Sequence, residues 1–368
     1  MRIMIQIGHP AHVHFYKNFI WHMQNEGHDI LIVCKDKDIA ISLLDNYGFN
    51  FEVISGKMLN GIGRIKKQFE YEFNTYKIAR KFKPNIITGI GGTAASHVSK
   101  MIGSKSIIFT DNFLNLDRYL THPWADVIIT PTSFSHNLGP KQIRVPSYKE
   151  LAYLHPDLFT PNPDIFSFLG IKESEKFVIV RFVSFEAAHD INVSGFDNYD
   201  KIRLVKSIQK HANVFISSEG KLPSELDKFS IKFPPEKIHD AIYYADLLVA
   251  DSQTMTTEAA ILGTPAVRCN GWVSSKNEML NFIELEQKYN LIHNFSNPDL
   301  AINKCCELLS YSDIKNQYRF RRQKLFKDKI NLTDFLIWFF RNYADSHKQF
   351  MQDFFTEYTG QESILNYS

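Results

Sequence analysis

The segment from 244 to 265 holds the residues whose types and spacing point most directly to chemistry. Four apolar residues, 247–250, precede a polar turn, 251–254, and a helical pattern begins near Met255. At the start of a helix the backbone N–H groups lack partners and carry partial positive charge, which favours a phosphate. Glu258 follows one turn later, and its carboxylate can accept hydrogen bonds from the two hydroxyls of a ribose. The segment therefore predicts a nucleotide site.

A purely structural interpretation explains some of the same residues. Asp251 or Ser252 would only cap the helix, and Glu258 would be a solvated acid in its first turn. Small residues in the helix favour the site instead, because they let the helix lie close to a sheet. Thr264-Pro265 then begins another apolar strand, as an alternating strand and helix unit requires.

The complete pattern resembles the C-terminal donor-site motif of the GT-B superfamily. It consists of Asp-Ser, a glutamate six places after Ser252, and Ala-Ala-Ile-Leu-Gly-Thr-Pro. That superfamily includes UDP-N-acetylglucosamine 2-epimerase, the N-acetylglucosaminyltransferase that makes lipid II, and poorly characterised glycosyltransferase-like proteins. In these relatives the glutamate holds the ribose of UDP, and the preceding turn holds its phosphates. The resemblance implies the first role for Glu258 and the second for Ser252, Gln253 and Thr254.

Length and composition are those of an ordinary globular protein. The 368 residues are enough for two domains with separate cores, and 44% hydrophobic and 22% charged residues are typical fractions. A net charge of +2 gives no support for nucleic-acid binding, which concentrates Lys and Arg. Four cysteines without a CxxC pair favour a reducing, cytoplasmic compartment. The opening MRIMIQIGHP predicts a strand rather than a cleavable signal.

Strands and helices alternate along both halves of the chain. In the first half we expect helices at 15–25, 37–47 and 64–81, and strands at 3–7, 29–34, 51–54, 85–88, 106–109 and 127–130. Strands separated by helices need crossover connections, so the sheet should be parallel and doubly wound. After a proline-rich passage, 144–164, strands at 177–183 and 213–217 repeat the rhythm.

These elements predict an α/β fold with two Rossmann-like, doubly wound domains that face a central cleft, as in GT-B proteins. The expected divisions are an N-terminal acceptor domain over 1–150, a linker over 151–170 and a nucleotide-sugar donor domain over 171–312. The helices of 313–368 should cross back to the first domain, as they often do in GT-B relatives.

Three histidines follow the first strand, in Gly8-His9-Pro10-Ala11-His12-Val13-His14. We expect a loop here that faces the cleft, and an imidazole titrates near neutral pH, which suits proton removal from a hydroxyl. Two alternatives remain: the rings only cap a helix that begins near Phe15, or they bind zinc. No acidic or thiolate partner lies nearby in the sequence, so we expect no metal. The resemblance to the lipid II-forming enzyme favours His12 as the catalytic base, with His14 next and His9 on the acceptor side.

Two further loops of the first half follow strands. Gly91 and Gly92 give the chain a flexible backbone that can approach an acceptor closely. Asp111 supplies a carboxylate that would act as the catalytic base or orient a histidine, with Asn112 beside it on the acceptor side; a simple turn at Thr110 to Asn112 is the structural alternative.

The second half places an arginine in an apolar strand. Arg181 is costly to bury unless it is paired, so we expect it to reach a diphosphate, with Glu186 or Asp190 as structural alternatives. His189 would donate to the leaving phosphate, and Ser218 would belong to the nucleotide pocket.

The sequence thus predicts a metal-independent glycosyltransferase that uses a nucleotide-diphosphate sugar, with UDP as the favoured nucleotide, in surface polysaccharide or glycoconjugate biosynthesis. It predicts no cofactor, a glycan or lipid-linked acceptor, no nucleic-acid partner and cytoplasmic residence with peripheral contact to the inner membrane surface. The alternatives are an enzyme like UDP-N-acetylglucosamine 2-epimerase, which needs no acceptor, and a non-catalytic nucleotide-sugar-binding protein.

Overall fold

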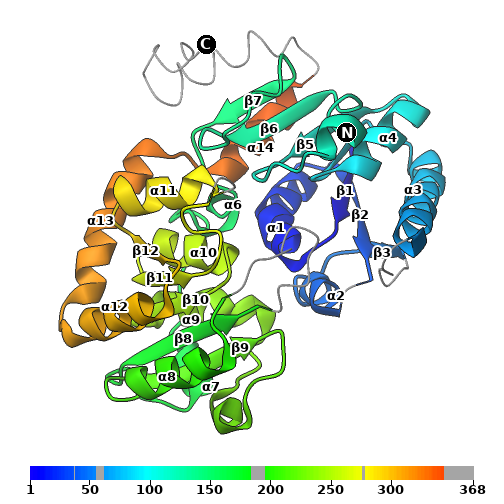
Figure 1. Cartoon of the computed structure of the whole chain (residues 1–368). Coiled ribbons are helices and arrows are strands. Elements are labelled where there is room, and N and C mark those ends of the chain that lie inside the picture. Colours follow the sequence, from blue (N-terminus) through cyan, green and yellow to red (C-terminus); the bar gives the residue numbers. More distant parts are fainter. Residues whose placement is uncertain (37, 55–61, 184–194, 276–277, 344–368) are drawn as a thin grey trace.

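The computed structural model describes residues 1–36, 38–54, 62–183, 195–275 and 278–343, and Figure 1 shows two parallel-sheet domains side by side. The first sheet has seven strands in the order β3-β2-β1-β4-β5-β6-β7. Their bounds are β1 (Arg2–Ile7), β2 (Asp29–Lys35), β3 (Phe51–Ile54), β4 (Ile86–Ile90), β5 (Lys105–Phe109), β6 (Val127–Pro131) and β7 (Gln142–Val145). The strand order reverses beside β1, which is where ligands of such sheets gather.

Helices cover both faces of this sheet. They are α1 (Pro10–Asn25), α2 (Asp38–Asn46), α3 (Ile62–Phe82), α4 (Thr93–Ile102) and the short α5 (Asp117–Leu120). Because both faces are covered, strands such as β1 and β6 are almost wholly buried. Apolar residues follow one another in them, as at 3–5 and 127–129, rather than alternating with polar ones.

The second sheet has five parallel strands in the order β12-β11-β10-β8-β9. Their bounds are β8 (Phe177–Phe182), β9 (Asn213–Ser218), β10 (Leu247–Ala250), β11 (Ala266–Cys269) and β12 (Ile292–Phe295). The helical segments of this domain are α7 (Asp164–Leu169), α8 (Asn198–Ile208), η1 (Ser224–Phe229), η2 (Pro235–Lys237), α9 (Ile238–Tyr244), α10 (Thr254–Leu262), α11 (Leu280–Gln287) and α12 (Pro298–Ser310). Both sheets together confirm the predicted α/β, GT-B-like fold class.

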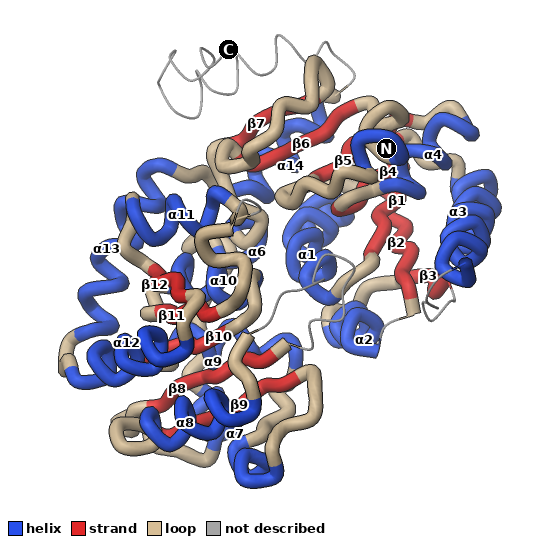
Figure 2. Tube along the Cα trace, in the orientation of Figure 1, coloured by secondary structure: helices blue, strands red, loops and turns tan. Residues whose placement is uncertain are grey.

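Two C-terminal helices pack on different domains, as the tube in Figure 2 shows. α13 (Ile314–Asp328) lies along α10, where Arg322 donates to the carbonyl of Leu262 at 2.6 Å. α14 (Leu332–Asn342) lies against α1, and the rings of Phe340 and Phe19 are 4.8 Å apart. No helix in the described part of the chain is long and apolar enough to cross a bilayer.

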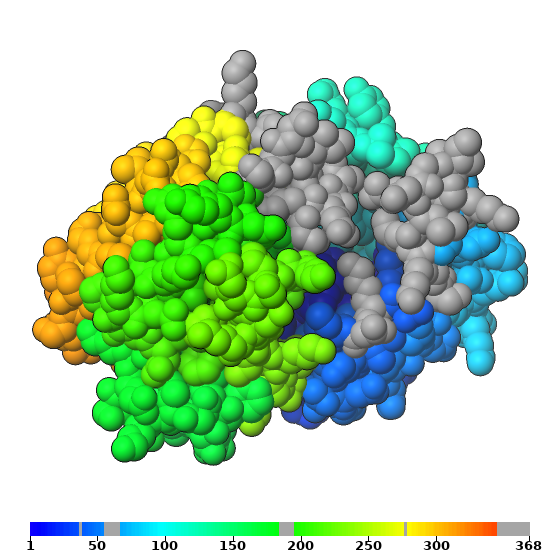
Figure 3. Space-filling view, turned by 60° about the horizontal axis from the view of Figure 1, so that its bottom comes forward, coloured from blue at the N-terminus to red at the C-terminus, as the bar shows by residue number. Residues whose placement is uncertain are grey.

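The domains also touch through a short helix between them. α6 (Leu151–Leu154) contacts α1, α10 and α14, so one helical turn contacts both domains. At another point of the same seam Asn46 of α2 donates to Glu236 of η2 at 3.0 Å, and Figure 3 shows the green second domain against the blue first domain. The proline-rich passage expected to be a linker therefore contains the end of β7 and the helix α6.

The start of α1 differs from the expected helix at 15–25. Pro10 occupies the first turn, where its missing N–H costs nothing, and the side chain of His9 accepts a hydrogen bond from the N–H of Ala11 at 3.1 Å. Helical structure therefore begins five residues earlier than predicted, and the expected open loop of three histidines is wrong.

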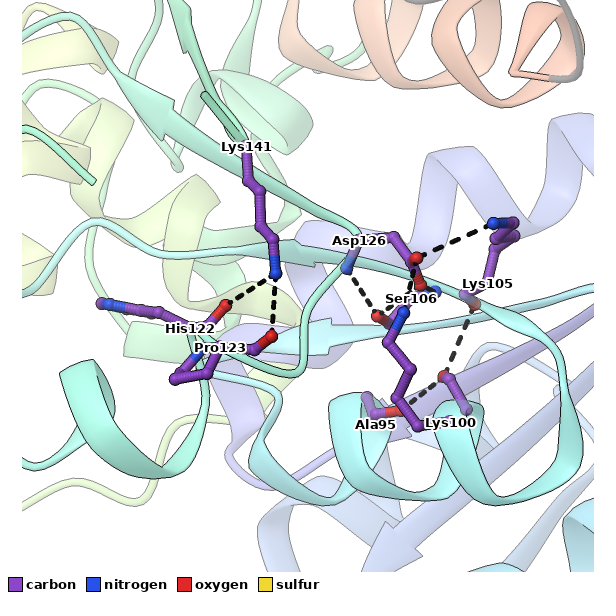
Figure 4. A network of polar contacts seen from close by, with 9 residues as sticks. Ala95, Lys100, Lys105, Ser106, His122, Pro123, Asp126 and Lys141 are labelled. Atoms are coloured by element: carbon purple, nitrogen blue, oxygen red, sulfur yellow. Dashed lines mark hydrogen bonds and ion pairs between the residues drawn. The ribbon is translucent and has the colours of Figure 1, made fainter. Parts of the chain in front are cut away.

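A polar network fixes the amino ends of two strands, away from the edge at which ligands gather (Figure 4). Asp126 accepts hydrogen bonds from the N–H of Ser106 at 2.9 Å and from Lys100 at 2.8 Å, and Lys141 donates to the carbonyl of Pro123 at 2.8 Å. The network holds β5 and β6 in register from the side opposite to the candidate site.

Gly92→Ala should lower the free energy of unfolding by about 2–4 kcal/mol, because two costs combine. Gly92 has φ of 59°, and an added Cβ would lie 2.4 Å from the Cγ2 atom of Ile108. Gly91 has φ of 74° with nothing within 4 Å, so Gly91→Ala carries the backbone cost alone. Urea denaturation of both variants checks this, and equal losses would contradict the packing argument.

Candidate functional site

The turn between β10 and α10 is held by Asp251. Its carboxylate accepts a hydrogen bond from the N–H of Val183 at 2.8 Å, and Asn270 donates to its carbonyl at 3.0 Å. Gly195 packs against the same side chain so closely that a Cβ there would lie 2.5 Å from a carboxylate oxygen. Burial raises the pKa of Asp251 to about 7, although the Val183 N–H opposes the shift. Asp251 therefore fixes the turn and is not the helix cap that the structural alternative proposed.

The N-terminus of α10 has no side-chain cap. Gln253 occupies the N-cap position without a capping bond, and the hydroxyl of Ser252 is buried with no hydrogen-bond partner in the described part of the chain. Thr254 is the first helical residue. The backbone N–H groups of the first turn and one buried hydroxyl are thus the donors that a phosphate would use.

Glu258 is buried at the seam between the domains, with 4% of its surface exposed. Its Oε1 atom accepts hydrogen bonds from the hydroxyl of Tyr153 in α6 at 2.7 Å and from His239 in α9 at 3.1 Å. Burial by itself would raise its pKa, but the charge and hydrogen bond of His239 and the bond from Tyr153 bring the pKa below its usual value. The alternative of a solvated first-turn acid is wrong, because Glu258 is an enclosed carboxylate.

His14 belongs to the same buried cluster. Its ring lies 4.6 Å from that of His239 and 5.5 Å from that of Tyr153, and its Nδ1 atom is 3.2 Å from the hydroxyl of Tyr47. Burial, with His239 and Lys17 nearby, holds the pKa of His14 well below its ordinary value. His14 of the first domain is therefore buried at the seam between the domains. Contrary to the prediction, it does not face an open cleft.

The other two histidines support the start of α1. His9 caps the helix, as described above, and Nδ1 of His12 accepts from the N–H of Gly8 at 3.3 Å. Their ring centroids are 6.0 Å apart. Over the described ranges no group of three His, Cys, Asp or Glu side chains is placed to hold a metal ion.

A cavity of about 390 Å³ lies between the domains. From the first domain it is lined by the loops after β5 and β6, and from the connection by Tyr148, Lys149 and Glu150. The second domain supplies Gln253, Trp272 and the residues 278–281. Of the predicted site residues, three line this cavity: Asp111, Asn112 and Gln253. The other predicted site residues that the structure describes do not line the cavity; they are His9, His12, His14, Gly91, Gly92, Arg181, Ser218, Ser252, Thr254 and Glu258.

Lys149 organises the charges of the cavity wall. Its Nζ atom lies 2.6 Å from Oδ2 of Asp111 and 3.6 Å from Oε1 of Glu150. Burial opposes the charged form of Lys149, but Asp111 and Glu150 outweigh it and raise its pKa. The carboxylate of Asp111 is therefore held by an ion pair across 38 residues of sequence rather than by a local turn.

The far wall of the cavity depends on a buried arginine. Arg268, at the end of β11, is fully buried, lies 3.8 Å above the ring of Phe282 and forms an ion pair with Glu278. Because Glu278 borders the cavity, this pair fixes the loop that leads into α11.

Arg181 has a partner other than the expected one. It donates to the hydroxyl of Ser217 at 2.8 Å and forms an ion pair with Glu219. The alternatives Glu186 and Asp190, together with the predicted His189, lie outside the described residues. Ser218 donates to the carbonyl of Gly220 at 2.9 Å, so its hydroxyl is engaged in the same turn.

The two glycines and Asn112 shape the first-domain loops. The N–H of Gly91 donates to the carbonyl of Phe109 at 2.9 Å, and Gly92 is the N-cap of α4. The carbonyl of Asn112 accepts from the hydroxyl of Thr110 at 2.8 Å, which leaves its side chain on the cavity wall.

Sequence reasoning missed several residues that complete the site. These are Tyr153 and His239 around Glu258, Lys149 and Glu150 on the cavity wall, and Asn281, whose side-chain carbonyl is buried without a hydrogen-bond partner among the described residues. The one signal available was His239, which lies in the stretch 235–244, where the sequence predicts a helix.

Two parallel-sheet domains, with α14 packed back on the first one, define a GT-B-like fold. The chain belongs to the DUF354 family, described as proteins of unknown function, whose model matches residues 1–290. A curated relative, the uncharacterised protein MJ0665 of Methanocaldococcus jannaschii, is 22% identical over 288 residues, which are 73% of this chain and 81% of the relative.

Solved structures share the fold at low sequence identity. UDP-GlcNAc 2-epimerase of Methanocaldococcus jannaschii has a TM-score of 0.60 and 14% identity, and the match covers 88% of this chain and 99% of the epimerase. The Streptomyces sp. SF2575 glycosyltransferase SsfS6, complexed with thymidine diphosphate, has a TM-score of 0.59 and 13% identity, with 91% and 99% covered. Transferases and epimerases are therefore both among the structures that this chain resembles.

His14→Phe should weaken the pH dependence of stability below neutral pH. The folded pKa of His14 lies below the unfolded value of 6.5, so only the unfolded state takes up this proton as pH falls. The wild type should lose up to about 1.4 kcal/mol of unfolding free energy per pH unit from this group below pH 6.5, and the variant should lose less. Urea denaturation between pH 7 and pH 5 measures the slope, with exposed His211→Phe as the control. Parallel slopes for wild type and His14→Phe would show that His14 does not contribute.

Proposed function

We propose that this protein binds a nucleotide-diphosphate sugar in its second domain and transfers the sugar to an acceptor held by the first. One observation carries the proposal: Gln253, at the uncapped N-terminus of α10, lines the same cavity as Asp111 and Asn112. The residues proposed for the donor and for the acceptor would thus meet at one place. The thymidine diphosphate named with SsfS6 supports a nucleotide as the ligand class.

The donor diphosphate would lie at the start of α10. Backbone N–H groups there and the hydroxyl of Ser252 offer hydrogen bonds, and the helix dipole favours the negative charge that develops on the leaving group. Arg181 would contribute less than expected, because Glu219 already neutralises it. The proposal needs no metal, since these donors supply the electrostatic stabilisation.

Glu258 would bind the ribose. Its Oε1 atom already accepts two hydrogen bonds, so ribose hydroxyls would use Oε2. Because only 4% of Glu258 is exposed, the seam formed by Tyr153 and His14 has to open before a nucleotide can reach it. In the proposed donor site the carboxylate of Glu258 is therefore charged and oriented before the nucleotide binds.

The acceptor would be an uncharged sugar. Amide and hydroxyl side chains dominate the polar lining, namely Asn112, Asn115, Ser133, Ser135 and Asn281. Such groups match the hydroxyls of an uncharged sugar. Of the three bases predicted from the sequence, Asp111 is the one that borders the cavity.

The proposal extends to the place in the cell where the protein would act. Surface polysaccharide or glycoconjugate assembly at the cytoplasmic side of a membrane would require contact with a lipid-linked acceptor. Phe69 and Phe73 on α3 are 68% and 56% exposed and would support such contact.

An epimerase is the second candidate, because the fold is shared with UDP-GlcNAc 2-epimerase. Incubation with UDP-N-acetylglucosamine alone separates the two functions. We expect no 2-epimer and slow release of UDP, since water is a poor substitute for the acceptor. Formation of the 2-epimer, detected by chromatography or NMR, would replace the transferase proposal with the epimerase.

Glu258→Gln should weaken UDP binding about tenfold or more, because it removes the charge from the acceptor of two ribose hydroxyls while keeping the shape of the side chain. Calorimetric titration with UDP measures the dissociation constant, and the exposed Glu225→Gln in the same domain is the control. Unchanged UDP affinity in a folded Glu258→Gln protein would remove the ribose assignment.

A further inference from the structure

The proposed function leaves one buried acid of the cavity wall without a role. Glu150 directly precedes α6, is 4% exposed and lines the cavity together with Asp111 and Gln253. Its Oε1 atom lies 3.6 Å from Nζ of Lys149, beyond hydrogen-bonding distance, whereas Oδ2 of Asp111 is bonded to that nitrogen at 2.6 Å. The ammonium group of Lys149 is therefore bonded to Asp111, whereas the carboxyl group of Glu150 is not bonded to that ammonium group.

The surroundings of Glu150 suit proton exchange near neutral pH. Burial raises its pKa to about 7; the charges of Asp111 and of Glu258 in α10 add to the shift, and Lys149 opposes it. Tyr148 and Tyr153 are further ionisable groups beside it, and burial raises the pKa of both. A general base works best when its pKa lies close to the working pH, and this carboxyl group meets that condition.

We propose that Glu150 is a further catalytic residue, which accepts the proton of the acceptor hydroxyl, and that Lys149 is a positioning residue that holds Asp111 beside it. The inference rests on the proposed transferase function. In the transfer step the acceptor O–H bond breaks and its proton passes to Glu150. The acceptor oxygen bonds to the anomeric carbon, the bond from that carbon to the diphosphate breaks, and the electron pair leaves with the diphosphate. Asp111 orients the hydroxyl through the oxygen that Lys149 does not hold.

The test follows UDP release from UDP-N-acetylglucosamine, with water as the acceptor, over a pH range centred on about 7. Wild-type rates should rise through pH 7 as Glu150 loses its proton. Glu150→Gln should lower kcat by about 100-fold or more and abolish this rise, while UDP affinity stays within about twofold. Glu72→Gln, at a paired glutamate of α3 remote from the cavity lining, should behave as wild type.

Variants of Lys149 provide a second measurement, the pH dependence of the rate. This dependence would not change if Lys149 had only a structural role. Removing its charge in Lys149→Met takes away the attraction that lowers the pKa of Glu150, so the rise in rate should move to higher pH. Lys149→Arg should return it toward neutral pH. An unchanged pH profile in Lys149→Met would show that the lysine does not act through Glu150.

The outcomes separate the inference from the function beneath it. If calorimetry detects no UDP binding to the wild type, the proposed function fails, and the inference fails with it. If UDP binds but Glu150→Gln keeps the wild-type kcat or the rise at pH 7, the inference alone is overturned. A wild-type protein that binds UDP but releases none from the sugar nucleotide would overturn it as well.

Discussion

A buried negative charge at the domain seam is the constraint on which the rest of this structure depends. The carboxylate of Glu258 lies out of water, and such a group is tolerated only where donors surround it. Tyr153 comes from the connection between the domains and His239 from the second domain, and His14 of the first domain packs its ring against both. The relative placement of the two domains therefore depends on the hydrogen-bond donors that this one buried carboxylate requires.

The parts of the site that sequence reasoning anticipated are those encoded by short spacings. The strand, turn and helix around Glu258 lie within one segment, so its local pattern predicted their type and order. Tyr153 lies 105 residues from Glu258, and Lys149 lies 38 residues from Asp111. Such pairs form because α6 and the residues just before it pack between the two sheets. No periodic pattern in the sequence indicates that packing. The alternating strands and helices predicted the body of both sheets for the same local reason, but not the short edge strands β7 and β12.

The histidines show how a small local preference changes a functional interpretation. Three imidazoles after a central strand indicated a catalytic loop, yet Pro10 and the capping side chain of His9 favour immediate helix formation. Once α1 begins there, His12 turns to the backbone of Gly8 and His14 turns into the seam. Asp111 and Asn112, in the loop after β5, then contribute to the first-domain wall of the cavity.

The single turn of α6 joins the two halves of the site more directly than either sheet does. Tyr153, which bonds the carboxylate of Glu258, and Glu150, on the cavity wall, are three residues apart and so lie about 5 Å apart along one helical turn. A movement of this turn as a unit would therefore shift Tyr153 and Glu150 together. The hydrogen-bond partner of Glu258 and one wall of the cavity thus belong to a single element of the fold.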